Sequence, residues 1–204
     1  MQNDISHLTI DAVIFDIGGV LVQTADLEPR RRWERVLGMP DWGLADAVFG
    51  SEPSREAFVG AADAGDVWRH IGERFGLDET QRMQIAHDFW AGDVINQPWI
   101  DDIAQLQKHM PTAILSNAWR DMRDRDRRRI DMSGFVSVVY SCEEGIRKPD
   151  PHIYERALER LNLRDASRVL FIDDFVENIE AARTVGLRAV RYEPGLTLAA
   201  ALCS

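Results

Sequence analysis

The chain has little cysteine: only Cys142 and Cys203 occur among its 204 residues, and their spacing fits neither a disulfide framework nor a thiolate metal site. Long hydrophobic runs are also missing, since no stretch approaches the ~20 apolar residues of a membrane-spanning helix. Residues 1–6 lack the basic and apolar segments of a secretory signal. From these absences we expect a cytoplasmic protein with no membrane partner.

Basic residues are outnumbered by acidic ones, 24 against 34, which gives a net charge of −10 with histidine neutral. Binding to nucleic acid or to an anionic membrane needs a basic surface, so we expect neither partner. Hydrophobic side chains make up 45% of the chain, which is typical of a globular protein. The length suits one domain, or a core domain that carries a modest insertion.

Short runs rich in Val, Ile and Phe predict buried parallel strands. The first run covers residues 11–16 and is followed by the pair Gly18-Gly19. The later runs cover residues 112–116, 135–140, 169–172 and 189–192. Helical patterns lie between them, at residues 100–110, 119–130, 152–161 and 176–185. This alternation predicts an α/β fold in which helices cover both faces of a Rossmann-like parallel sheet.

The segment 23–98 differs, because it has helical periodicity and no convincing strand. The predicted helices cover residues 30–36, 54–64, 67–75 and 79–90. We interpret segment 23–98 as an α-helical cap inserted into a core formed by residues 1–22 and 99–204. Such an insertion would lie above the carboxyl edge of the sheet, where open α/β sheets bind ligands.

Four polar segments stand at the ends of predicted strands, and strand ends of a parallel sheet meet at one edge. They are residues 16–20, 116–117, 147–150 and 173–174. The carboxylates of Asp16, Asp173 and Asp174 would repel one another there unless a cation neutralised them. Mg²⁺ favours carboxylate oxygens together with substrate phosphate, so we expect Mg²⁺ as the cofactor.

A charge tally extends this interpretation to a phosphorylated substrate. A phosphate monoester adds up to about −2 at neutral pH, and only Mg²⁺ and Lys148 are obvious counter-charges. Lys148 would keep Asp16 ionised, while Ser116 and Asn117 would donate hydrogen bonds to the phosphoryl oxygens. Asp16 then has the properties of a carboxylate nucleophile that forms an aspartyl-phosphate.

The order of these motifs resembles the haloacid dehalogenase-like hydrolase superfamily. The matching segments are Phe15-Asp16-Ile17-Gly18-Gly19-Val20-Leu21, Leu115-Ser116-Asn117, Gly145-Ile146-Arg147-Lys148-Pro149-Asp150-Pro151, and Phe171-Ile172-Asp173-Asp174 with Asn178. The likeness covers residues 10 to about 193. Within the superfamily, residues 116–119 and 171–174 look like the branch that contains the phosphatase domains of soluble epoxide hydrolases and small sugar-phosphate phosphatases.

The resemblance implies a role for each matching residue. Asp16 would be the nucleophile and a metal ligand, and Asp174 would be a direct metal ligand that Asp173 supports. Asn178 would orient Asp174 without touching the metal. The remaining implied roles are the backbone carbonyl of Gly18 for the metal, Ser116 and Lys148 for catalysis, and Gly18, Gly19, Ser116, Asn117 and Lys148 for substrate binding.

One residue departs from the pattern, because phosphatases that the chain resembles carry an acid two residues after the nucleophile, where this sequence has Gly18. Our leading hypothesis is a Mg²⁺-dependent phosphatase that acts on a small phosphorylated metabolite. Gly18 keeps two alternatives open. One is a metal-independent hydrolase of the dehalogenase type, and the other is a weakly active or inactive regulatory protein that binds phosphometabolites. The sequence is compatible with a monomer or a homodimer.

Overall fold

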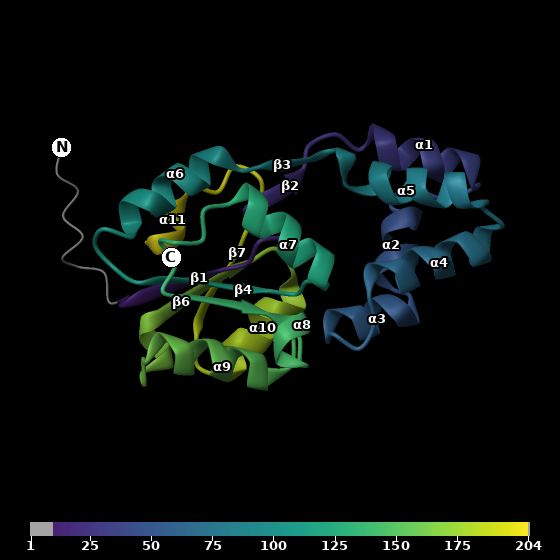
Figure 1. The fold of residues 1–204 in the computed structure, drawn as a ribbon. Coiled ribbons are helices and arrows are strands. Elements are labelled where there is room, and N and C mark those ends of the chain that lie inside the picture. Colours follow the sequence, from purple (N-terminus) through teal and green to yellow (C-terminus); the bar gives the residue numbers. More distant parts are fainter. Residues whose placement is uncertain (1–9, 204) are drawn as a thin grey trace.

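The computed structural model describes residues 10–203 and contains a sheet-based core with a group of helices beside it (Figure 1). The core sheet has five strands in the order β5-β4-β1-β6-β7, and all neighbouring pairs are parallel. Its strands are β1 (Ala12–Phe15), β4 (Thr112–Ser116), β5 (Ser137–Tyr140), β6 (Val169–Asp173) and β7 (Arg188–Arg191). The predicted parallel α/β fold is therefore confirmed.

The register of the central strands sets the position of the polar strand ends. Phe15 of β1 is paired with Ile114 of β4 and with Ile172 of β6. The residue after Phe15 is Asp16 and the residue after Ile172 is Asp173, so both carboxylates leave the sheet at the same edge. The strands are buried on both faces, which explains their continuous apolar runs.

Helices cover both faces of the sheet (Figure 1). Apolar residues of α6 and α11 pack on one face of β1, while residues of α9 and α10 pack on the other. The core helices are α6 (Gln97–Leu106), α7 (Arg120–Arg129), α8 (Ser141–Glu144), α9 (Pro151–Leu161), α10 (Val176–Thr184) and α11 (Leu198–Leu202), with the 3₁₀ helix η2 at Ala166–Arg168. None of the helices in the described part of the chain combines the length and the apolar character that a membrane crossing requires.

Five helices form the cap between β1 and β4. They are α1 (Glu28–Val36), α2 (Gly43–Phe49), α3 (Glu52–Phe58), α4 (Ala64–Phe75) and α5 (Glu79–Ala91). The helix expected at residues 54–64 ends earlier, because the chain turns at Gly60 with a φ of 75°. The division of the chain at residues 22/23 and 98/99 stays a prediction.

The expectation that segment 23–98 contains no strand was wrong. Strands β2 (Val22–Thr24) and β3 (Asp93–Ile95) pair antiparallel and form the linker between the core and the cap. Each strand has three residues, which is too short for an alternating pattern to be recognised in the sequence. The chain passes between core and cap twice, and the two passages lie side by side. Their backbone N–H and C=O groups pair with each other, which gives the two short strands.

An aromatic cluster in the cap includes one residue of the core. The ring of Trp119 lies 6.0 Å from that of Phe49, 5.9 Å from that of Phe58 and 6.0 Å from that of Trp90. Trp119 stands directly before α7 and is 1% exposed. Burial of such a ring removes a large apolar area from water, so Trp119 attaches the core to the cap.

We expect Trp119→Ala to lower the free energy of unfolding by ~3–5 kcal/mol, because the truncation leaves a cavity in a packed aromatic cluster. Urea denaturation checks this value. Met83→Ala is the control, because Met83 is 66% exposed and its truncation should change stability by only ~0.5 kcal/mol. Equal effects of the two substitutions would contradict the attachment.

Candidate functional site

The centre of the site is the buried ammonium group of Lys148. Its Nζ lies 2.9 Å from Asp16 Oδ1 and 2.6 Å from Asp173 Oδ2, and Lys148 is 1% exposed. Asp16 follows β1, Asp173 ends β6, and Lys148 comes from the loop before α9. The structure therefore brings together three predicted residues from three separate parts of the chain.

Asp173 is held by hydrogen bonds from several donors. Asn178 Nδ2 donates to both carboxylate oxygens, at 2.9 and 3.0 Å, and the backbone N–H of Phe175 donates to Oδ1 at 2.8 Å. We expected Asn178 to orient Asp174, but its amide binds Asp173 instead. Asn178 lies in the first turn of α10, and from there its amide reaches the carboxylate of Asp173.

Asp174 has a different environment, since its Oδ1 is buried without a hydrogen-bond partner among the described residues. One carboxylate oxygen from each of Asp16, Asp173 and Asp174 can be chosen so that all three lie within 4.8 Å of one another. An orphaned buried oxygen is costly, and a hard cation with oxygen ligands would satisfy it. The donor set of this site therefore fits Mg²⁺.

Two adjacent glycines, Gly18 and Gly19, follow the strand that carries Asp16. Only at Gly19 would the side chain of another residue collide with its surroundings. A Cβ on Gly19 would lie 2.1 Å from Asp174 Oδ2, and Gly19 has a φ of 76°, so the backbone approaches the carboxylate as only glycine allows. Gly18 is exposed and has open space around its Cβ position, with no left-handed φ. A side chain at position 18 would therefore fit.

The loop after β4 is tied to the loop that carries Lys148. Asn117 Nδ2 donates to the carbonyl of Lys148, and the N–H of Lys148 donates to Asn117 Oδ1, both at 2.9 Å. The Asn117 side chain, which we expected to bind substrate, is thus occupied with positioning Lys148. Ser116 lies at the end of β4 and is 3% exposed, with no hydrogen-bond partner for its hydroxyl among residues 10–203.

Burial and neighbouring charges together shift the pKa values of the site. Burial raises the pKa of Asp16 to about 8, with Lys148 lowering it and Asp173 and Asp174 raising it further. Burial and then the neighbouring Asp173 raise the pKa of Asp174 to about 6. For Lys148, burial lowers the pKa, but the charges of Asp16 and Asp173 outweigh it, so the net pKa is raised. The site holds more negative charge than its lysine compensates.

One contact that shapes the site has no signal in the sequence. Ser141 Oγ accepts a hydrogen bond from the N–H of Ala118 at 3.0 Å and so fixes the loop after Ser116. A serine in a short helix carries no distinguishing pattern, and only the parallel pairing of β4 with β5 brings the two residues together.

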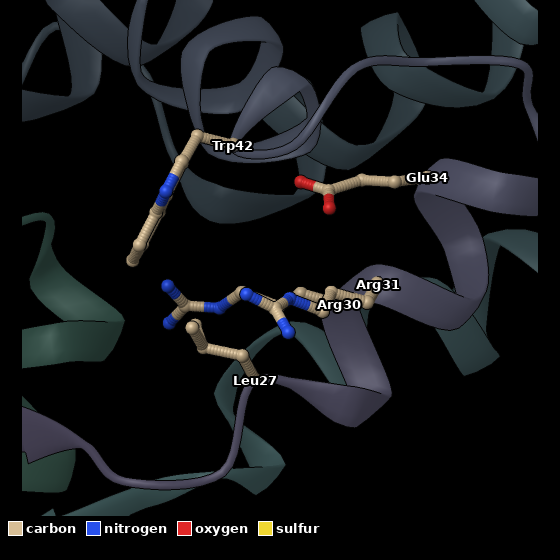
Figure 2. A pocket seen from close by; sticks show the side chains of 5 residues that line it. All are labelled: Leu27, Arg30, Arg31, Glu34 and Trp42. Carbon is tan, nitrogen blue, oxygen red and sulfur yellow. The ribbon is translucent and has the colours of Figure 1, made fainter.

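A separate cavity lies within the cap and is lined by Leu27, Arg30, Arg31, Glu34 and Trp42. Figure 2 shows the two arginine side chains between Trp42 and Leu27. None of the predicted catalytic or metal-binding residues lines this cavity, so it is not part of the site around Asp16.

A family model of haloacid dehalogenase-like hydrolases matches residues 10–186, which confirms the resemblance seen in the motifs. The chain is 27% identical over 199 residues to bifunctional epoxide hydrolase 2 of Mus musculus, a match that covers 88% of this chain and 36% of that protein. It is 26% identical over 187 residues to a sesquiterpene phosphatase of Aspergillus oryzae, covering 88% of each chain. The chain thus spans only about a third of the mouse relative.

Solved structures show the same fold. A HAD family enzyme from Bacteroides thetaiotaomicron, in complex with magnesium and inorganic phosphate, matches with a TM-score of 0.75 and 18% identity, covering 93% of this chain and 97% of that one. An L-2-haloacid dehalogenase from Xanthobacter autotrophicus matches with a TM-score of 0.64 and 22% identity, covering 94% of this chain and 80% of that one. At these identities the likeness establishes the fold alone.

The raised pKa values predict how stability depends on pH in protein kept free of divalent metal by a chelator. Unfolded carboxyls titrate near 3.8, whereas the pKa is about 6 for Asp174 and about 8 for Asp16 when folded. The folded protein therefore binds more protons between these values, and the free energy of unfolding falls as pH rises from about 4 to about 8. We expect Asp174→Asn to flatten the part of this fall between about pH 4 and pH 6.

Urea denaturation at a series of pH values measures the slope. Asp41→Asn, at an exposed cap position, is the control and should keep the parent slope. Parallel curves for Asp174→Asn and the parent would show that Asp174 does not carry a raised pKa.

Proposed function

Because this chain belongs to the haloacid dehalogenase-like hydrolase family, we propose that it is a Mg²⁺-dependent phosphatase acting on a small phosphorylated metabolite. The observation that carries this proposal is the cluster of Asp16, Asp173 and Asp174 around one buried lysine. Phosphatases among the relatives support the same reaction class.

Asp16 and Asp174 would hold the metal ion, with the backbone carbonyl of Gly18, while Asp173 supports the cluster through Lys148. When bound, Mg²⁺ would neutralise the carboxylates and the phosphoryl oxygens. The unpartnered oxygen of Asp174 and the close approach of Gly19 to that carboxylate support this assignment. Asp173 is less available, because Lys148 and Asn178 already occupy both of its oxygens.

Asp16 is proposed as the nucleophile of a two-step reaction. One carboxylate oxygen of Asp16 forms a bond to phosphorus while the bond from phosphorus to the leaving oxygen breaks, and that oxygen takes up a proton. A water molecule then attacks phosphorus, the bond to the Asp16 oxygen breaks, and inorganic phosphate leaves. Lys148 lowers the pKa of Asp16 against the effect of burial and so favours the ionised form that the first step needs, and a bound Mg²⁺ would favour that form further.

Lys148 and Ser116 are proposed to bind the transferring phosphoryl group. Both are buried at the carboxyl edge of the sheet, where a hydroxyl donor and an ammonium group are strong partners for phosphoryl oxygens in the absence of bulk water. Asn117 would act on the substrate only indirectly, because its side chain is hydrogen-bonded to the backbone of Lys148 and so positions that lysine. The substrate in this proposal is a small phosphomonoester.

A dehalogenase is the second candidate, and the fold likeness to the Xanthobacter enzyme supports it. A dehalogenase would use Asp16 to displace a halide. A halide leaving group needs no proton, so the absence of an acid at position 18 would be expected. A metal-independent reaction, however, would leave Asp173 and Asp174 as neighbouring carboxylates beside a nucleophile that must also be ionised. The charge of the site therefore favours the phosphatase over the dehalogenase.

We expect the purified protein to release phosphate from phosphomonoesters only when Mg²⁺ is present, and Asp16→Asn to abolish this activity because an amide is a poor nucleophile. A phosphate-release screen with and without Mg²⁺, run beside 2-chloropropionate with halide detection, measures both candidates. Asp41→Asn, at an exposed cap position, should retain the parent rate. Parent-level turnover by Asp16→Asn would refute the nucleophile, and halide release without metal would favour the dehalogenase.

The open space at Gly18 makes the proton donor testable, because we expect Gly18→Asp to supply the acid that the sequence lacks. A positioned acid contributes ~10²–10⁴-fold to a rate, and alkyl phosphates need it more than aryl phosphates, whose leaving groups are already acidic. The ratio of kcat/KM for an alkyl to an aryl phosphate should therefore rise by at least ~10-fold. Gly18→Ala, which adds only a Cβ, should leave that ratio unchanged. An unchanged ratio in folded Gly18→Asp would show that the proton comes from another group.

A further inference from the structure

The linker between the cap and the core carries a buried carboxylate, Asp93 on β3, whose side chain is 5% exposed. Its Oδ1 accepts a hydrogen bond from Thr24 Oγ1 at 2.7 Å and one from Arg30 at 3.2 Å. Its Oδ2 lies 3.6 Å from a guanidinium nitrogen of Arg125, and its backbone carbonyl accepts a hydrogen bond from Arg129 at 2.8 Å. Four groups from three other elements therefore converge on one linker residue.

These partners belong to different bodies of the molecule. Arg30 comes from α1 of the cap, where its Nε also donates to the carbonyl of Phe89 at 2.6 Å. Arg125 comes from α7 of the core, and its guanidinium lies 4.1 Å from the centre of the Trp90 ring in the cap. The carboxylate of Asp93 thus lies between a cap arginine and a core arginine, on the strand through which the chain returns from the cap to the core.

Helix α7 connects this linker to the site. Its N-terminal neighbour is Trp119, which is buried in the cap cluster and comes three residues after Ser116. Further along, Arg125 and Arg129 of the same helix reach Asp93. The cap is therefore attached to α7 at the end near the site and again at the linker, which leaves little freedom to rotate while both attachments hold.

We propose that Asp93 is a positioning residue that fixes the orientation of the cap over the site, by pairing with Arg30 of the cap and Arg125 of the core. Without its negative charge, the two guanidinium groups would lie partly buried with no carboxylate between them, and a rotation that exposes them to water would relieve their repulsion. Only the effect on catalysis rests on the proposed phosphatase function, whereas the effect on cap orientation does not.

Asp88 provides a matched control, because it is a buried acid with partners in the cap alone. It is 6% exposed and accepts hydrogen bonds from Trp33 Nε1 and Gln84 Nε2, both at 2.8 Å, and it pairs with Arg32. Asp88→Asn therefore disturbs a buried acid of the cap without touching the connection to the core.

The orientation is measured by electron–electron double resonance between two spin labels. One label is placed on the native exposed Cys203 of the core and the other on Met83→Cys, an exposed cap position, in the full chain. We expect a single narrow distance distribution in the parent and in Asp88→Asn, and a broader or shifted one in Asp93→Asn and in Arg125→Gln. Should Asp93→Asn fail to fold, Arg125→Gln carries the test. An unchanged distribution in the folded variants, or equal broadening in Asp88→Asn, would overturn the proposal.

The catalytic readout uses p-nitrophenyl phosphate with Mg²⁺. We expect Asp93→Asn to lower kcat at least ~5-fold and Asp93→Glu, which restores the charge, to recover part of the loss, while Asp88→Asn retains the parent kcat. A parent without phosphatase activity whose distance distribution responds as described would refute the proposed function and support the positioning role. A kcat that is equal in Asp93→Asn and the parent, despite a broadened distribution, would overturn the link from cap orientation to catalysis.

Discussion

The ion cluster of Lys148 with Asp16 and Asp173 is the interaction on which the site depends. All three groups are almost fully withdrawn from water, and each would be costly to bury alone. The parallel register brings the two carboxylates to one edge, and the ammonium group makes their proximity tolerable. Removing one partner of such a buried pair typically costs ~3–5 kcal/mol, because the other charge is left uncompensated.

The cluster remains unbalanced, and this imbalance is functional in our interpretation. Three carboxylates meet one lysine, and the pKa values of Asp16 and Asp174 are raised first by burial and then by the neighbouring negative charges. Asn178 and Lys148 satisfy Asp173 fully, whereas Asp174 keeps a buried oxygen without a partner among residues 10–203. A site made only for stability would pair that oxygen, so the unpaired one indicates where a cation belongs.

The sequence predicted the elements whose pattern is local and long. The buried runs at β1, β4 and β6 and the motif residues that follow them could be read directly, because apolar continuity and strand-end position are properties of the chain itself. The sequence did not predict the three-residue strands of the linker or the two hydrogen bonds between the Asn117 side chain and the backbone of Lys148. Both depend on which distant segments of the chain meet in the fold. The partner of Asn178 was misassigned for a related reason, because helical spacing alone does not tell which of two adjacent carboxylates an amide reaches.

The two glycines after Asp16 differ in their cause. Steric contact requires glycine at position 19, whereas at position 18 the fold leaves room for a side chain. Gly19 is dictated by space, because any Cβ there would collide with Asp174 and disturb the carboxylate cluster. Gly18 is not, because its Cβ direction is open and its backbone is ordinary. The absence of an acid at position 18 is therefore not forced by the fold. A phosphatase that keeps glycine there must obtain the leaving-group proton from water, from the substrate or from the cap, and without a positioned acid it favours substrates whose leaving group needs that proton least. A proton supplied by the cap would also depend on the cap orientation that we propose Asp93 fixes.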